Sequence, residues 1–164
     1  MLFWFLGVSV VVVLWVFRSP ALDYRLVLLG SVLPVGEAAL GGPRVLHTLL
    51  ASVVLLTVVM LATRQRRLLR RQLISLPIGL MVHLVLDGIW TRSEVFWWPF
   101  LGLGFGEGQL PELDRPVVLV VVLEVVGVAA LAWWWRACGF ADPERRERFL
   151  RTGQLPRDVI TPGP

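Results

Sequence analysis

The segment RQRRLLRR at residues 64–71 carries five arginines within eight positions, and long apolar runs lie on both sides of it. A block of positive charge between two membrane spans resists translocation and marks the cytoplasmic side of a membrane protein. The segment therefore predicts a membrane protein and also its orientation, because every other loop takes its side by alternation along the chain.

The composition agrees with this prediction. The 164 residues are 56% hydrophobic and only 17% charged, and their mean hydropathy of +0.72 exceeds that of ordinary soluble domains. All sixteen basic residues are arginines, and they gather at the ends of apolar runs. We interpret the net charge of +4 as a topology signal and predict no nucleic-acid binding. The single cysteine, Cys138, excludes an internal disulfide and a cysteine-based metal cluster.

Four apolar segments approach the roughly 20 residues that a helix needs to cross a bilayer core about 30 Å thick. They are residues 2–17, 45–63, 73–90 and 117–135. We therefore predict an all-α fold, a polytopic membrane helical bundle of four transmembrane helices that forms one domain over residues 1–138. A shorter apolar stretch at 26–34 predicts a re-entrant or interfacial segment in an outer loop.

Alternation from an inner 64–71 loop predicts that the N- and C-termini are both cytoplasmic and that loops 18–44 and 91–115 lie outside. Eleven arginines then fall inside and five outside. For the cytoplasmic tail, residues 139–164, we predict a short amphipathic helix whose N-terminus is capped by Asp142. We expect the chain to be disordered after Gly153.

Pro77 leaves the third span open to two interpretations. It lies inside that span, or it begins a later span, with residues 64–76 forming a cytoplasmic amphipathic helix. In the second case the helix runs on toward Trp98, and Asp87 lies near the middle of the membrane instead of near its outer end.

Four ionisable residues interrupt the apolar runs: His47, His83, Asp87 and Glu124. Such groups cost roughly 2.5–3.5 kcal/mol at the centre of an inserted helix, so they tend to be functional. His83 and Asp87 are four residues apart and share a helix face. Counting from the outer ends places Glu124 at the depth of His83, with His47 and Asp87 one turn higher, so the four groups can meet.

Three interpretations of these residues remain open. Two imidazoles with one or two carboxylates suit zinc or a similar divalent metal, with His47, His83 and Asp87 as ligands. Glu124 or Glu37 would then be the general base of a hydrolase acting on a lipid-linked or periplasmic substrate. Alternatively, the same groups form an interhelical polar network in a structural or accessory protein. A proton or solute pathway is the third interpretation.

Three segments, PRVLHTLL at 43–50, HLVLD at 83–87 and FWWPF at 96–100, occur in an order and spacing similar to a known family. Over roughly residues 24–100 the chain resembles the bacterial YdjM-like (LexA-regulated) inner-membrane metal-dependent hydrolases. The resemblance implies a multi-pass protein of the bacterial cytoplasmic (inner) membrane, with the lipid bilayer as its partner and a metal-dependent hydrolytic site near the extracytoplasmic face.

The resemblance extends to part of the ligand set. His47 matches the second histidine of the family's His-Arg-x-x-Thr-His-Ser motif, and His83 and Asp87 match its His-x-x-x-Asp motif. Two departures precede His47, one before the first motif and one within it. Val35 stands where the family has an acid, with Glu37 nearby, and Gly42 stands where it has the first histidine. About half of the family's ligands are therefore present.

Overall fold

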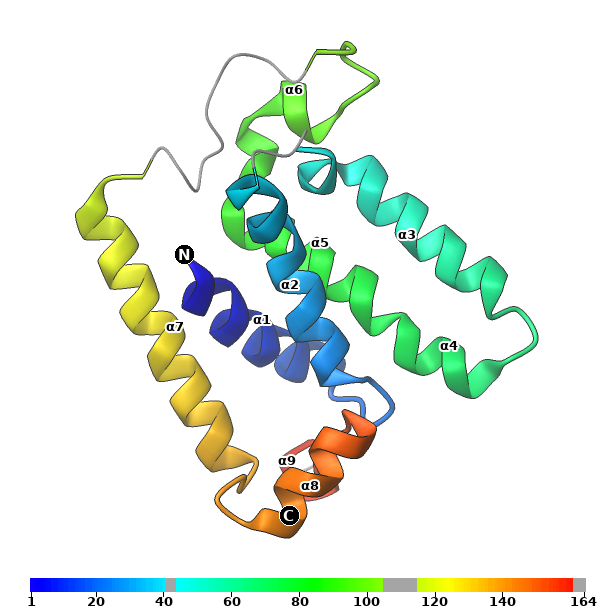
Figure 1. Cartoon of the computed structure of the whole chain (residues 1–164), viewed down its shortest axis with the longest axis vertical. Coiled ribbons are helices and arrows are strands. Elements are labelled where there is room, and N and C mark those ends of the chain that lie inside the picture. Colours follow the sequence, from blue (N-terminus) through cyan, green and yellow to red (C-terminus); the bar gives the residue numbers. More distant parts are fainter. Residues whose placement is uncertain (41–43, 105–114, 161–164) are drawn as a thin grey trace.

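The computed structural model describes residues 1–40, 44–104 and 115–160, and within these ranges the chain is helical, without a β-strand (Figure 1). The longer helices are α1 (Leu2–Phe17), α2 (Tyr24–Ala39), α3 (Leu49–Ala62), α4 (Arg67–Leu73), α5 (Ser75–Asp87), α7 (Val117–Ala137) and α8 (Pro143–Thr152). Short helical turns form η1 (Val45–His47), η2 (Ile89–Thr91), α6 (Ser93–Phe96) and α9 (Arg157–Ile160).

The chain runs back and forth between two ends of the bundle (Figure 1). One end holds the α1–α2 turn, the α3–α4 turn, and α8 with α9; we call it the arginine-rich end. The other end holds η1, the last turn of α5, η2, α6 and the start of α7; we call it the histidine end. α2 packs mainly on α5, and α7 packs mainly on α1. α1 also contacts α2 and α5, so it lies between α7 and the rest of the bundle.

The segment at residues 26–34, predicted to be re-entrant or interfacial, is part of a longer helix. These residues belong to α2, a helix of 16 residues that continues through Pro34 and contributes Val27, Gly30 and Ser31 to the interior. Glycine, serine, proline and glutamate dilute the apolar pattern of α2, which is why the sequence suggests a shorter element. The four predicted spans each coincide with a helix or with part of one, and α2 is a further long helix between the two ends of the bundle.

The first residue and the C-terminal helices lie at opposite ends of the bundle (Figure 1). The Met1 amine lies 3.3 Å from the Glu124 carboxylate at the histidine end. At the arginine-rich end, the Tyr24 amide donates a hydrogen bond of 2.8 Å to the Gly153 carbonyl. The bundle therefore differs from the expectation that both termini lie on one side.

The structure decides between the two interpretations of Pro77. α4 and α5 are joined through Ile74, whose backbone is helical and whose amide donates to the Arg70 carbonyl. The combined stretch ends at Asp87, because Gly88 follows with φ of 73° in the left-handed region. Asp87 thus lies at a helix end, and the helix does not run on toward Trp98.

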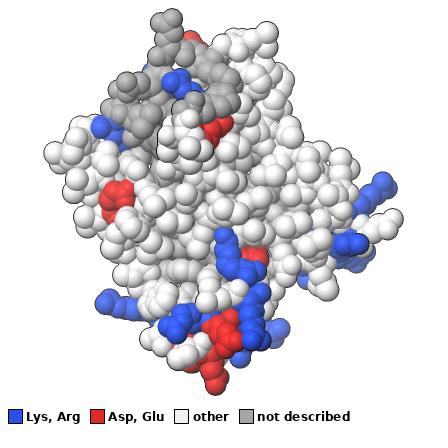
Figure 2. Space-filling model, viewed as in Figure 1, with Lys and Arg blue, Asp and Glu red and all other residues white. Residues whose placement is uncertain are grey.

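Two helical stretches, Arg67–Asp87 and Val117–Ala137, are long and apolar enough to cross a membrane, and α1 and α3 are shorter apolar helices. α7 turns most of its valines outward, since only Gly127 and Trp134 of this helix are buried. Figure 2 shows a largely uncharged middle, with arginines gathered at the lower end and at the α3–α4 corner.

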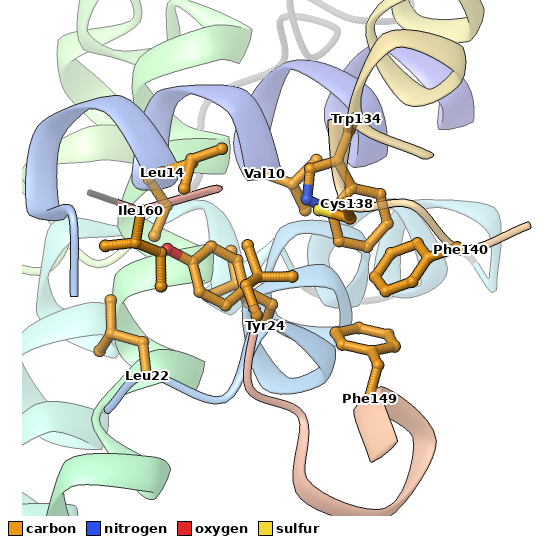
Figure 3. Packing of buried hydrophobic residues seen from close by; sticks show 12 residues of the cluster. Val10, Leu14, Leu22, Tyr24, Trp134, Cys138, Phe140, Phe149 and Ile160 are labelled. Atoms are coloured by element: carbon orange, nitrogen blue, oxygen red, sulfur yellow. The ribbon is translucent and has the colours of Figure 1, made fainter. Parts of the chain in front are cut away.

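The C-terminal helices pack on the bundle through an aromatic cluster (Figure 3). The rings of Trp134, Phe140 and Phe149 lie in mutual contact, with centroids 4.8–5.6 Å apart. Beside them Cys138 is fully buried, and this burial raises the pKa of its thiol to about 12.

The expected amphipathic helix of the tail is α8, and the Asp142 side chain accepts a hydrogen bond from the Glu144 amide at its start. The expected disorder after Gly153 does not begin there. Leu155 and Ile160 are buried in the larger hydrophobic core that includes these rings, so the chain is packed as far as residue 160. The remaining four residues lie outside the described part.

Glycines allow the two main helix pairs to pack closely. A methyl group added at Gly30 of α2 would overlap the Leu76 carbonyl of α5, and one added at Gly79 would overlap the Val27 carbonyl. The α1–α7 crossing is similar, since a methyl group at Gly7 would overlap the Gly127 carbonyl. Small residues that let helix backbones approach are characteristic of membrane helix packing.

Two glycines of α2 offer a matched test of this packing. Gly30→Ala should lower the free energy of unfolding by about 1–3 kcal/mol, because the new methyl group forces α2 away from α5. Gly36→Ala meets open space, so it should leave stability unchanged or raise it by about 0.4–1 kcal/mol. Unfolding in mild detergent, followed by circular dichroism, measures both; equal effects would contradict the proposed close contact.

Candidate functional site

His83 of α5 is fully buried and is held by two neighbouring helices. Its ring stacks on Phe5 of α1 with centroids 4.0 Å apart and an interplanar angle of 33°. Its Nδ1 lies 2.8 Å from the Ser31 carbonyl oxygen of α2. A carbonyl can only accept a hydrogen bond, so Nδ1 carries the proton, and in the neutral ring Nε2 keeps the lone pair.

His47 of η1 lies beside His83. Its ring is also fully buried and meets the His83 ring edge to face, with centroids 5.5 Å apart and an interplanar angle of 77°. On its other side, the Nδ1 atom of His47 is 3.5 Å from the Glu37 Oε2 atom. This separation is within ion-pair range but longer than a hydrogen bond.

Glu37 fixes the position of the η1 turn. The turn lies beyond the end of α2, and the Glu37 carboxylate accepts hydrogen bonds of 2.9 Å from both the Val45 and the Leu46 amides. Two donors at the start of η1 are thereby satisfied, as helix starts require. Thr48 then caps α3 by accepting from the Ala51 amide, so the chain on both sides of His47 is fixed.

Asp87 lies one helical turn beyond His83 and is buried. The Arg115 guanidinium donates a hydrogen bond of 2.6 Å to the Asp87 backbone carbonyl and lies 3.5 Å from the carboxylate. Arg115 also reaches the Met1 sulfur, at 3.3 Å. The last turn of α5 is therefore tied to the start of α7 and to the start of α1.

Glu124 does not join the histidines. Its carboxylate accepts a hydrogen bond of 3.0 Å from the Phe3 amide and lies 3.3 Å from the Met1 amine. Both partners belong to the beginning of α1, the helix that separates α7 from α5. The four groups expected to meet are therefore divided: His47 and His83 are in ring contact, Asp87 pairs with Arg115, and Glu124 faces the start of α1. Glu37, and not Glu124, is the carboxylate beside His47.

We call Glu37, His47 and His83 the histidine cluster. Within residues 1–40, 44–104 and 115–160, no three histidine, cysteine, aspartate or glutamate side chains gather closely enough to hold one metal ion.

The sequence does not identify all of the residues that contact the histidines. Ser31 contributes only its backbone carbonyl, and Phe5 cannot be told from other apolar residues of its helix. Arg115 could have been identified as a candidate partner of a buried acid, because it is one of few arginines in the predicted outer loops.

The surroundings of the two histidines fit the donor chemistry of a divalent metal. Metal-ligating histidines usually direct one ring nitrogen to a backbone carbonyl or a carboxylate, which orients the other nitrogen toward the metal. His83 has this arrangement with the Ser31 carbonyl, and His47 faces the Glu37 carboxylate. Imidazole nitrogens and carboxylate oxygens are both common zinc ligands.

Comparison with protein-family models, with curated proteins and with solved structures finds no match for this chain.

Two glutamates at the histidine end test the role of Glu37. Glu37→Ala should lower the free energy of unfolding by about 2–4 kcal/mol, because two backbone donors lose a charged acceptor. Glu94→Ala, at an exposed position of α6, should change it by less than about 0.5 kcal/mol. Thermal unfolding in detergent measures both variants, and a small effect at Glu37 would show that the η1 turn is held by other contacts.

Proposed function

We propose that the protein is an integral membrane protein whose helices cross the bilayer five times, with its arginine-rich end in the cytoplasm. Three of the sixteen arginines, Arg44, Arg92 and Arg115, lie at the histidine end, which leaves thirteen at the arginine-rich end. This asymmetry exceeds the eleven to five of the four-span prediction, and an excess of arginine marks the cytoplasmic side. The histidine cluster then lies near the extracytoplasmic face of a bacterial inner membrane.

We further propose that the histidine cluster binds a divalent metal ion, zinc or a similar one, and that the protein is a metal-dependent hydrolase. The observation that carries this proposal is the orientation of His83. Its Nδ1 is held by the Ser31 carbonyl, and its ring lies against the ring of the only other histidine. Two fully buried imidazoles in contact are costly in a bundle that could bury apolar side chains instead.

Each residue has a distinct role in this proposal. His47 and His83 would be the protein ligands, since no third histidine, cysteine, aspartate or glutamate of the described residues lies close enough to share one ion with them. Asp87, one helical turn from His83, is held by Arg115 instead. Glu37 would orient His47 and not act as the base, since both of its oxygens accept backbone amides. A bound ion would polarise a phosphoryl or carbonyl oxygen of the substrate. The position at a membrane face suits a lipid-linked or periplasmic substrate.

A second candidate function is supported by the contacts of the acids. Arg115 holds Asp87, and the start of α1 holds Glu124, so both acids join helices to one another. The polar groups would then form an interhelical network in a structural or accessory protein, without catalysis. The two functions differ in one measurable property, which is whether the protein binds metal.

Metal content is therefore the decisive measurement. The purified full chain should carry close to one divalent ion, determined by elemental mass spectrometry after zinc loading and dialysis. His83→Gln and His47→Gln should each lose this ion, because each removes an imidazole ligand. Glu124→Gln should retain it, since Glu124 faces α1 and not the histidines.

Circular dichroism of each variant controls for folding in this experiment. A folded wild-type protein that retains no zinc, manganese or other divalent ion after loading would rule out the hydrolase and favour the structural network. Loss of the ion in Glu124→Gln would also contradict the assignment, because that residue lies outside the cluster.

Orientation can be tested by cysteine labelling in a Cys138→Ala background. Ser93→Cys at the histidine end should react with a membrane-impermeant maleimide in spheroplasts of the expression host. Gln65→Cys at the arginine-rich end should react only after the membrane is permeabilised. Both positions are exposed in the fold, so reaction differences report the side of the membrane. The reverse pattern would overturn the proposed orientation.

A further inference from the structure

A second site lies at the arginine-rich end, far along the helices from the histidine cluster. A cavity of about 810 Å³ opens between the α1–α2 turn, α4, α8 and α9. Its volume is within the range of small-molecule sites, roughly 300–1,000 Å³. Its lining includes four arginines and one acid: Arg71, Arg145, Arg148, Arg157 and Asp158.

The charges that line this cavity are unbalanced. Arg145 donates a hydrogen bond of 3.0 Å to the Asp158 carboxylate, and this bond lowers the pKa of Asp158, so the pair is neutral at physiological pH. Neither Arg71 nor Arg148 then has an acidic partner among the lining residues. Within the described part of the chain, Arg71 and Arg148 form no ion pair and no side-chain hydrogen bond.

The elements around the cavity hold these arginines in place. Arg71 comes from α4, which continues into the membrane helix α5, and Arg148 comes from α8. α8 is tied to the bundle because the Arg25 guanidinium donates to the Leu150 carbonyl at 2.6 Å. Phe149, next to Arg148, is buried in the aromatic cluster. Two cationic groups from distant parts of the sequence therefore face one cavity on a packed scaffold.

The position of the cavity matches the polar boundary of the proposed membrane. α4 is amphipathic, and its Leu68 lines the cavity while 79% of this side chain is exposed. The buried Leu155 also lines the cavity. Guanidinium groups recognise phosphate through paired hydrogen bonds, and basic pockets between helices on the cytoplasmic side bind phospholipid headgroups.

We propose that this cavity binds a phosphate group, presented by the headgroup of an anionic phospholipid of the cytoplasmic leaflet. Arg71 and Arg148 would donate to the phosphate oxygens, and Leu68 would face the lipid chains. This inference goes beyond the proposed function, because it concerns the opposite end of the bundle and requires no metal.

The test is native mass spectrometry of the full chain in mild detergent, titrated with phosphatidylglycerol or phosphatidylcholine. The protein should bind phosphatidylglycerol more tightly. Arg71→Gln/Arg148→Gln should weaken that binding by roughly tenfold to thirtyfold, as expected for two interfacial arginines. The matched control Arg136→Gln/Arg146→Gln removes two exposed arginines at the same end that do not line the cavity, and should retain binding.

A second arm identifies the source of the phosphate. Displacement of phosphatidylglycerol by millimolar inorganic phosphate would show that the cavity recognises the phosphate alone and accepts soluble anions. Binding that resists inorganic phosphate would show that the lipid chains contribute. Both results support a phosphate site.

Two results would overturn the proposal: equal binding of the two lipids, or equal losses in the two double variants. The single variant Arg148→Gln repeats the comparison if the double variant is unfolded by circular dichroism. Metal content measured on the same samples separates this test from that of the histidine cluster, since Arg71→Gln/Arg148→Gln should not change it.

Discussion

The close approach of α2 and α5 is the constraint on which the rest of the structure depends. Gly30 and Gly79 let the two backbones meet, and the next residue after Gly30 is Ser31, whose carbonyl accepts from His83. A larger side chain at either glycine would move that carbonyl away from the imidazole. The packing of two helices and the orientation of the histidine are therefore one feature. α2 also ends near Glu37, so the same crossing positions the η1 turn and His47.

The charges follow the two ends of this bundle. Arginines collect at one end, where α8 and α9 fold back on the α1–α2 turn, and the histidines lie near the other. Charged groups at the histidine end are mostly paired with a specific partner, as Arg115 is with Asp87 and Glu37 is with two amides. Arginines at the opposite end include some without an acidic partner, such as Arg71 and Arg148. One end is thus organised by internal contacts, and the other retains charge for an external anion.

The sequence predicts the apolar helices well because long, nearly uncharged apolar runs have few alternative structures. It underestimates the length of α2, because glycine, serine and proline lower the mean hydropathy of a helix whose buried side is tightly packed. It also fails at Glu124. The depth of a residue along a span can be counted from the sequence, but the sequence does not say which helices are neighbours. In the structure, α1 lies between Glu124 and the histidines. The pair His83 and Asp87 was found because a four-residue spacing fixes a shared face whatever the tertiary arrangement.

The short helices have a consequence for where the histidine cluster would lie in a membrane. α1 and α2 have 16 residues and α3 has 14, so they rise about 21–24 Å, less than the roughly 30 Å of a hydrocarbon core. A bilayer around them would thin locally, or polar turns would enter it. Either response brings the η1 turn and the end of α5 to the level of the lipid headgroups. Exposed side chains there would meet both water and lipid, whereas His47 and His83 are themselves fully buried behind them.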